Sequence, residues 1–328
     1  ASVEFNVRSG SRDRPQVRAA VSGTGVSLVV EGPLPGRRGS WLVSARQSYL
    51  DLVIERLVDD QVQFGFSDAQ AKAVYDLSPS QRLQFTVLAG RSRLKEPEDQ
   101  IDANDLYVGL NASAIGIGRW QWTGARSVVN AGIMGGVNRF SNETLGGVDL
   151  DRGREQQLSV RFDARHQLSP ALELEAGGEV DVLDESRWRQ RPVTSTTYRV
   201  INDYTGEGTR LGVYGTAHWT VAPWLSVLPG VRVDRSSLTD DSTASPWVQA
   251  VWRVASGTVV RGATGVYQQF PTFEQVIGAW GTPDLHPERA TSLDVGVEQA
   301  IGQSARLQVT VYDREEQDFL RRPGIEPR

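Results

Sequence analysis

The chain has 328 residues, a formal net charge of −5 and no cysteine, so disulfides, thiol nucleophiles and cysteine zinc sites are excluded. The acidic balance argues against nucleic acid as a partner. No run of 18 apolar residues occurs, which excludes a transmembrane helix. A membrane β-barrel stays open, because barrel strands alternate apolar and polar side chains and average to neutral hydropathy.

Short turns recur along the chain, and alternating apolar and polar runs flank each of them. In chain order we expect turns at 32–39, 77–82, 123–127, 168–172, 221–225, 254–258 and 300–306. Longer polar segments lie between the hairpins, at roughly 50–63, 92–104, 140–155, 184–208, 236–245 and 270–290. This pattern predicts about fifteen antiparallel strands, with short turns at one end and long loops at the other.

The stretch 158–184 shows the alternation most clearly. Leu172, Leu174 and Val180 belong to one set of alternate positions, and the other set is mostly charged. We expect the apolar set to face lipid and the charged set to face a barrel lumen. Burying these charges between two packed sheets would cost several kcal/mol for each unpaired charge. A soluble sheet with one solvent-exposed face would give the same alternation and is the alternative. The predicted lumen-facing charges are Arg161, Asp163, Arg165, Glu173, Glu175 and Glu179.

Aromatic residues gather near the ends of the expected strands. They are Trp41, Tyr49, Trp120, Trp122, Trp219, Trp224 and Trp247. Aromatic girdles at both interfaces are typical of outer-membrane barrels, whereas ordinary core aromatics are the alternative. A propeller would need four-strand repeats with a recurrent motif, and here the repeat is a two-strand hairpin. The sequence therefore predicts an all-β, antiparallel transmembrane β-barrel.

Catalytic and metal motifs are absent from the sequence. His166, His218 and His286 are scattered without metal-ligand spacing, and no G-x-S-x-G occurs. Asp149 and Asp151 resemble a calcium loop faintly, but the remaining ligands are missing. We therefore expect no enzyme, no cofactor and no metal. A hydrolase built into the barrel rim would need a histidine beside a carboxylate such as Asp184 or Asp203.

Ligand capture is expected at the long polar segments. Aromatic faces beside guanidinium groups would suit an iron chelate, a corrinoid or a sugar, although the same side chains could pack on one another. Arginine greatly outnumbers lysine, which occurs only at Lys72 and Lys95. Arginine forks bind carboxylates and lipopolysaccharide phosphates well, while genomic base composition would also explain the bias. The candidate ligand-binding residues are Trp188, Arg189, Arg191, Tyr198, Phe270, Phe273 and Trp280.

Several segments carry a resemblance to the TonB-dependent outer-membrane receptors. "EGPLPGRRGSWLVSARQSYLDLV" (31–53) resembles the early barrel of that family, and "FSDAQAKAVYDLSPSQRLQFTVLAG" (66–90) its next hairpin. "YQQFP" (267–271) followed by "LHPERATSLDVGVEQ" (285–299) resembles a late hairpin. "ASVEFNVRSG" is similar to the strand that ends the family's plug domain. The resemblance runs along nearly the whole chain.

The resemblance implies a domain plan and a transport function. Residues 1–12 would end the plug, and 13–328 would form a partial barrel, about 15 strands of a 22-stranded one. The family implies the outer membrane of a Gram-negative bacterium, import of a scarce nutrient such as a ferric siderophore, and energy from the TonB complex. Its further partners would be the small-molecule ligand, outer-membrane lipid and lipopolysaccharide.

The chain also departs from the family. Most of the plug, including its Ton box, is missing, and the chain ends at "RRPGIEPR" without the usual terminal aromatic, so we expect an internal piece of a receptor. A passive porin or surface-binding barrel is the alternative function, and a barrel-embedded hydrolase is a further one.

Overall fold

The computed structural model describes residues 7–50, 63–99, 101–302 and 304–319, most of which lie in β-strands. A 3-10 turn, η1 (Pro35–Arg37), and a short helix, α2 (Phe273–Ile277), interrupt them. No helix in these described ranges is long and apolar enough to cross a membrane. The strands are β1 (Gln16–Val21), β2 (Gly25–Pro33), β3 (Gly39–Ser48), β4 (Gln63–Ser78), β5 (Gln81–Lys95), β6 (Val108–Thr123), β7 (Ser127–Glu143), β8 (Asp149–Ser169), β9 (Leu172–Pro192), β10 (Tyr198–Ala222), β11 (Leu225–Ser236), β12 (Ser242–Ala255), β13 (Thr258–Gln269), β14 (Glu288–Ile301) and β15 (Ala305–Gln317).

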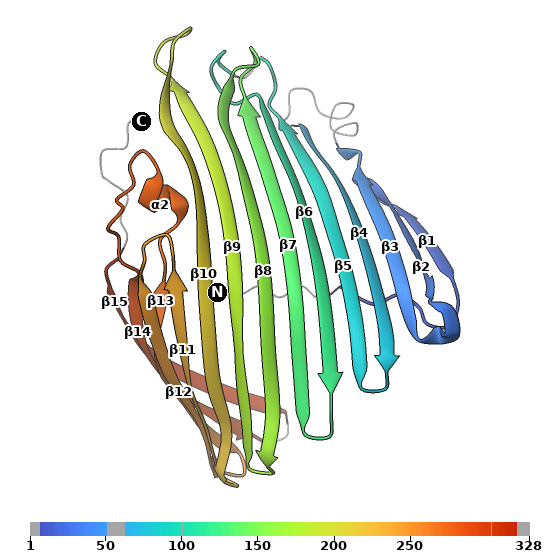
Figure 1. Ribbon diagram of the computed structural model, residues 1–328, viewed down its shortest axis with the longest axis vertical. Coiled ribbons are helices and arrows are strands. Elements are labelled where there is room, and N and C mark those ends of the chain that lie inside the picture. Colours follow the sequence, from blue (N-terminus) through green and yellow to red (C-terminus); the bar gives the residue numbers. More distant parts are fainter. Residues whose placement is uncertain (1–6, 51–62, 100, 303, 320–328) are drawn as a thin grey trace. The chain divides into compact units, whose positions relative to one another are not determined.

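The strands form one 15-stranded sheet, in which they follow one another in sequence order (Figure 1). Each strand from β2 to β14 therefore pairs with the strand before it and the strand after it. The predicted all-β antiparallel fold and the strand number are confirmed. All seven predicted turns fall between consecutive strands, as at 123–127, where β6 ends at Thr123 and β7 begins at Ser127.

The prediction that the long polar segments are loops is partly wrong, because strands extend far into them. Of the segment 184–208, only 193–197 lies between β9 and β10, and of 140–155 only 144–148 lies between β7 and β8. Beyond the apolar positions both sets of side chains become polar, which hides the period of two. The backbone ladder continues there, since its hydrogen bonds do not depend on side-chain polarity. Residues 51–62 of the segment expected at 50–63 lie outside the described residues.

The chain divides into two compact units. Unit 1 comprises residues 1–122, 131–160 and 182–207. Unit 2 comprises residues 123–130, 161–181 and 208–328. In unit 1 the register places Leu83 of β5 opposite Trp120 of β6, and Arg91 opposite Ala112. In unit 2 it places Gly230 of β11 opposite Trp247 of β12.

Large apolar side chains are exposed on one set of alternate strand positions in each unit. In unit 1, Phe85 is 56% exposed and Ile133 is 52% exposed. In unit 2, Phe162 and Val213 are each 51% exposed. Contiguous apolar surface of this kind is unfavourable in water and suits a lipid-facing barrel wall.

Most of the aromatic residues expected near strand ends do lie there, but Trp247 does not. Trp120 and Trp122 are among the last four residues of β6, whereas Trp247 is the sixth residue of β12. Its ring covers Gly230, where an added Cβ would lie 2.2 Å from Trp247 Cζ2. Trp247 therefore fills the space left by a glycine on the neighbouring strand, which is a common way to cover a strand glycine.

Candidate functional site

The chain before β1 lies against one face of the sheet in unit 1. Cross-strand register and alternation place Lys72 and Asp76 of β4 on the same face. Lys72 donates a hydrogen bond to the carbonyl of Val7, and Arg12 donates one to Asp76. We call this side the inner face, and the opposite side, which carries Phe85, the outer face.

A fully buried carboxylate fastens the same segment to the sheet. Glu31 of β2 is 1% exposed, and it accepts hydrogen bonds from Arg8 and from Arg18 of β1. Burying a carboxylate is costly unless it is paired. The two guanidinium groups, one from before the sheet and one from its first strand, supply that pairing.

Replacement of Glu31 by glutamine is expected to loosen the segment 7–15. Because both arginines are about half exposed, the loss should be about 1–2 kcal/mol rather than that of a fully buried pair. Amide hydrogen exchange in residues 7–15 of the purified protein would measure it, with faster exchange expected in the variant. Asp68→Asn, which breaks the exposed Arg46–Asp68 pair, serves as the control and should leave that exchange unchanged. Equal exchange in Glu31→Gln and the native protein would contradict the assignment.

A charge cluster occupies the inner face near the loop ends of β8 and β9. Gly118 pairs with the outer-face Phe85 and approaches Ile133 of β7, so alternation places Phe140 of β7 on the inner face. Gly153 of β8 approaches the Phe140 ring, so Asp151 lies on the inner face as well.

Asp151 accepts hydrogen bonds from Arg187, at 2.8 and 3.1 Å, and from Arg189 Nε at 2.9 Å. The guanidinium of Arg187 also lies 5.6 Å from the centre of the Phe140 ring. Two guanidinium groups are therefore held on one carboxylate at this place.

The pKa of Asp151 reflects the same arrangement. Asp151 is the third residue of a 21-residue strand, and about 9–11 residues suffice to cross a bilayer, so it lies outside the membrane-spanning part. Burial raises its pKa, but the hydrogen bonds from Arg187 and Arg189 outweigh burial and hold the pKa below its ordinary value. Asp151 is therefore ionised at neutral pH and holds both arginines in place.

In unit 2 the predicted lumen-facing charges form ion pairs, either with one another or with a neighbouring strand. Arg165 contacts Glu175 at 2.8 Å and Glu173 at 3.4 Å. Glu179 pairs with Arg232 of β11 at 2.6 Å. Asp163 accepts a hydrogen bond from Asn130 at 2.7 Å and lies 3.7 Å from Arg161. These side chains occupy the charged positions of the alternation, and that they face a lumen stays a prediction.

The structure separates the ligand-binding residues expected at 184–208. Trp188, Arg189 and Arg191 are in strand β9, so Trp188 points to the face opposite the two arginines. Trp188 stacks under the Arg152 guanidinium, 5.0 Å from the ring centre. Tyr198 donates a hydrogen bond to Asn104 Oδ1 at 2.5 Å.

The residues expected at 270–288 lie in unit 2. Phe273 is in helix α2 and only 4% exposed, whereas Trp280 is 56% exposed. Phe270 lines a hollow of about 290 Å³ together with Arg210, Glu179 and Asp181. A binding role for these residues stays a prediction.

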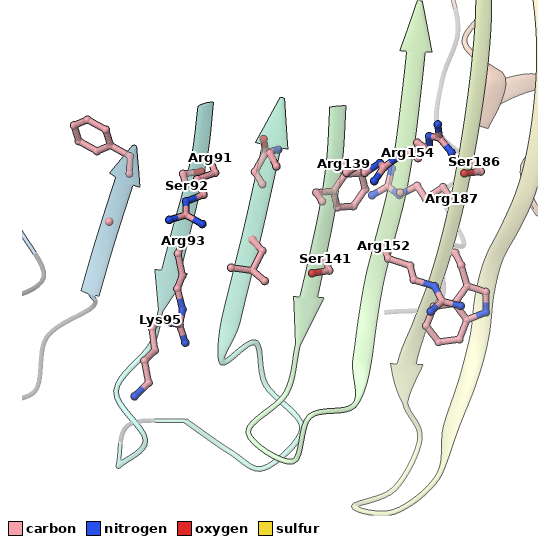
Figure 2. Close-up of a pocket in the computed structure, with 18 of the residues that line it drawn as sticks. Arg91, Ser92, Arg93, Lys95, Arg139, Ser141, Arg152, Arg154, Ser186 and Arg187 are labelled. Carbon is pink, nitrogen blue, oxygen red and sulfur yellow. The ribbon is translucent and has the colours of Figure 1, made fainter. Parts of the chain in front are cut away.

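A larger hollow of about 1330 Å³ in unit 1 was not predicted from the sequence. It crosses β3 to β10 near their loop ends, and each strand from β5 to β10 contributes three or four lining residues. Figure 2 shows several of these side chains. Asp203 is the carboxylate in its lining. The basic residues that line it are Arg91, Arg93, Lys95, Arg139, Arg152, Arg154 and Arg187. Only the R-x-R spacings "RSR" at 91–93 and "RGR" at 152–154, late in alternating runs, could have signalled it.

The hydrolase alternative required a histidine beside a carboxylate. His286 Nδ1 lies 3.5 Å from Asp241 Oδ1, with most of the histidine side chain exposed. His166 Nδ1 lies 2.7 Å from the hydroxyl of Ser127. In the part of the chain that the structure describes, no group of three or more His, Cys, Asp or Glu side chains is placed to hold a metal ion.

The sequence matches the family model described as TonB dependent receptor-like, beta-barrel, over residues 36–325. The match covers most of the chain, so this protein belongs to the TonB-dependent receptor family, whose members are transporters of the Gram-negative outer membrane. It is an outer-membrane protein and corresponds to part of the family's barrel. No curated protein matches the sequence.

Solved structures with the same fold include receptors for different cargoes. A mutant of the ferric enterobactin receptor PfeA from Pseudomonas aeruginosa superposes with a TM-score of 0.71 at 11% identity, covering 92% of this chain and 52% of that chain. The siderophore receptor PirA from Acinetobacter baumannii gives 0.71 at 11%, covering 93% and 52%. The copper transporter OprC gives 0.69 at 14%, covering 95% and 55%. The chain therefore spans about half the length of these structures, and the likeness shows the fold alone.

Proposed function

We propose that the chain is the barrel portion of an active transporter that imports a ferric siderophore, energised through TonB. Family membership over residues 36–325 is the observation that carries this proposal. Two of the similar structures are siderophore receptors and one is a copper transporter, so the choice of a siderophore rests on the chemistry of the inner face. No bond of the substrate is broken in this function.

The proposed domain plan assigns residues 1–12 to the end of a plug and 13–328 to the barrel. The inner-face contacts of Val7, Arg8 and Arg12 support it, since a plug occupies the interior of such a barrel. The TonB complex would act on this plug, so the Glu31 pairing would hold the junction between plug and barrel while force is applied.

The inner-face cluster at the loop ends suits an anionic ligand. Asp151 fixes Arg187 and Arg189, and the Phe140 ring lies beside Arg187. Guanidinium groups form strong charge-assisted hydrogen bonds with anionic oxygen ligands, and aromatic rings stack on planar groups. A ferric chelate with negative charge and flat ligand arms would use both. Arg191, on the same face of β9, extends the positive surface.

Transport assays in an iron-starved Gram-negative host would test the proposal. The complete gene product is expected to support uptake of a radiolabelled anionic ferric chelate in a host with TonB and not in one without it. The double variant Arg187→Gln/Arg189→Gln should bind the chelate at least tenfold more weakly, because each charge-assisted hydrogen bond contributes about 1.5–3 kcal/mol.

The matched control is Arg154→Gln. Alternation along β8 places Arg154 on the face opposite Asp151, so this variant should leave uptake unchanged. Uptake that persists without TonB would instead support the passive porin. A requirement for TonB without any effect of the inner-face variant would keep energised transport and reject this ligand site.

A further inference from the structure

The connection between β13 and β14 folds back across the sheet in unit 2. Phe273 belongs to α2 in this connection, and an added Cβ on Gly208 of β10 would lie 3.2 Å from its Cζ. Strands β11 and β12 lie between β13 and β10 in the sheet. The connection therefore reaches across three strand spacings, about 14 Å, instead of extending away from the strand ends. We call residues 270–282 the strap.

The strap lies on the face of unit 2 that carries the ion pairs. Val213 of β10 is 51% exposed and belongs to the apolar set, so alternation places Gly208 on the opposite face. Tyr214 is on the same face as Gly208 and donates a hydrogen bond to Glu175 at 3.1 Å. Because Glu175 also pairs with Arg165, we call this side of unit 2 the charged face.

The strap is a tightly packed segment. Phe273 is 4% exposed and Val276 is 3% exposed. The amide of Thr272, the residue before α2, donates to Gln275 Oε1 at 2.7 Å. The amide of Thr282 donates to the carbonyl of Gln275 at 2.8 Å. Buried side chains and internal hydrogen bonds of this kind hold a segment in one conformation.

Polar contacts also fasten the strap to the sheet. Pro271 is fully buried, and its carbonyl accepts a hydrogen bond from the Arg210 guanidinium at 3.3 Å. Arg210 lies two positions from Gly208, so β10 supplies both the hydrogen bond and the contact with the ring. After the strap, His286 Nδ1 lies 3.5 Å from Asp241 Oδ1, next to the start of β12.

The charges beside the strap already have partners. Phe270 lines the hollow of about 290 Å³, and Arg232 lies in the same lining. Arg232 contacts Glu179 at 2.6 Å and Asp234 at 2.7 Å. An anionic solute that reached Arg232 would have to compete with both carboxylates. The strap therefore occupies space on the charged face without covering a ready site for an anion.

We propose that Gly208 and Phe273 form a lock that keeps the strap docked on the charged face, and that the docked strap limits the size of the solute that the lumen admits. A side chain at position 208 would take the place of the ring, which is a reason for a glycine inside a strand. The inference rests on the proposed transport function, because that function makes the charged face the wall of the lumen.

Amide hydrogen exchange in the complete gene product tests the lock. Phe273→Ala empties the contact, and Gly208→Val puts methyl groups where the ring lies. Residues 271–282 are expected to exchange at least tenfold faster in both variants than in the native protein. Phe273→Leu keeps a large apolar side chain, so its exchange should stay within threefold of the native rate.

Gly215→Val is the matched control for the glycine substitution. Gly215 lies on the same strand and, by alternation, on the opposite face. Among the described residues nothing comes within 4 Å of a Cβ added there. Exchange in residues 271–282 should therefore be unchanged in this variant.

Uptake of two labelled solutes tests the size limit. They are a ferric tris-catecholate and the same chelate joined to a bulky inert polymer. Phe273→Ala and Gly208→Val should import the bulky conjugate at least fivefold faster than the native protein does. Their uptake of the unmodified chelate should change less than twofold, which a general loss of folding would not produce.

Two results would overturn the inference. One is exchange in residues 271–282 that is as fast in the native protein as in Phe273→Ala, which would show that no lock exists. The other is a released strap with unchanged exclusion of the bulky conjugate. If Gly208→Val fails to fold, as judged by heat-dependent gel mobility, Phe273→Ala and Phe273→Leu decide. Hydrogen exchange needs no transported ligand, so a failed lock is distinguishable from a failed transport function, in which the native protein imports neither solute.

Discussion

Replacement of Gly39 by alanine is expected to destabilise the barrel by about 3 kcal/mol. Gly39 begins β3 and pairs with Tyr75 of β4. An added Cβ would lie 2.0 Å from the carbonyl oxygen of Val74 and 3.0 Å from the Cα of Tyr75. Both atoms belong to backbone, so no rotamer change can remove the overlap. The two strands would have to separate, which breaks the hydrogen bond from the Asp76 amide to the Arg38 carbonyl.

A second glycine substitution supplies the control. Gly116 of β6 lies in the same unit, and nothing comes within 4 Å of a Cβ added there. Gly116→Ala should change the free energy of unfolding by less than about 0.5 kcal/mol, or stabilise slightly, because alanine restricts the unfolded chain. Denaturant titration of the complete gene product in detergent micelles measures both variants. A Gly39→Ala protein as stable as Gly116→Ala would show that β3 and β4 do not approach as described.

Removal of the Asp151 carboxylate has the second large expected effect. Asp151→Ala leaves Arg187 and Arg189 without this shared acceptor, and both are less than one third exposed. Breaking a fully buried pair costs about 3–5 kcal/mol. Since water reaches these arginines in part, we expect about 2 kcal/mol, measured as the change in the free energy of unfolding at pH 7.

The pairing of Asp151 with the two arginines also makes the free energy of unfolding depend on pH. The pKa of Asp151 is lower in the folded protein than its ordinary value of about 3.9. Its contribution to stability is therefore fully present above about pH 4 and is lost as the pH falls through the lower folded pKa. The stability difference between the native protein and Asp151→Ala should shrink on acidification below about pH 4.

Asp149→Ala is the matched control for this prediction. It lies two residues away on β8, and among the described residues its one ion pair is with the exposed Arg152. Surface pairs contribute about 0–1 kcal/mol, so its effect should stay below about 0.5 kcal/mol. Equal losses in the two aspartate variants would mean that Asp151 is no more than a surface charge.

The candidate ligand residues show where sequence reasoning stops. Trp188 and Arg189 are neighbours in a segment expected to be a loop, where both could point to one ligand. The segment is strand, so Trp188 joins Arg152 on the outer face while Arg189 joins Asp151 on the inner one. The placement of Trp188 and Arg189 on opposite faces could not be predicted, because polar residues on both faces erase the alternation that distinguishes a strand from a loop.

The sequence by itself determined the hairpins of this protein. Turn residues such as those at 123–127 and the alternation at 172–180 are local signals, and a period of two leaves one face apolar whichever strand lies alongside. Only the tertiary structure decided which distant charges meet. Arg91 and Arg93 of β5, Arg139 of β7 and Arg152 and Arg154 of β8 lie far apart in the sequence but line one hollow (Figure 2). Register between strands depends on pairing across the whole sheet, and a shift of one residue would turn these arginines to the other face.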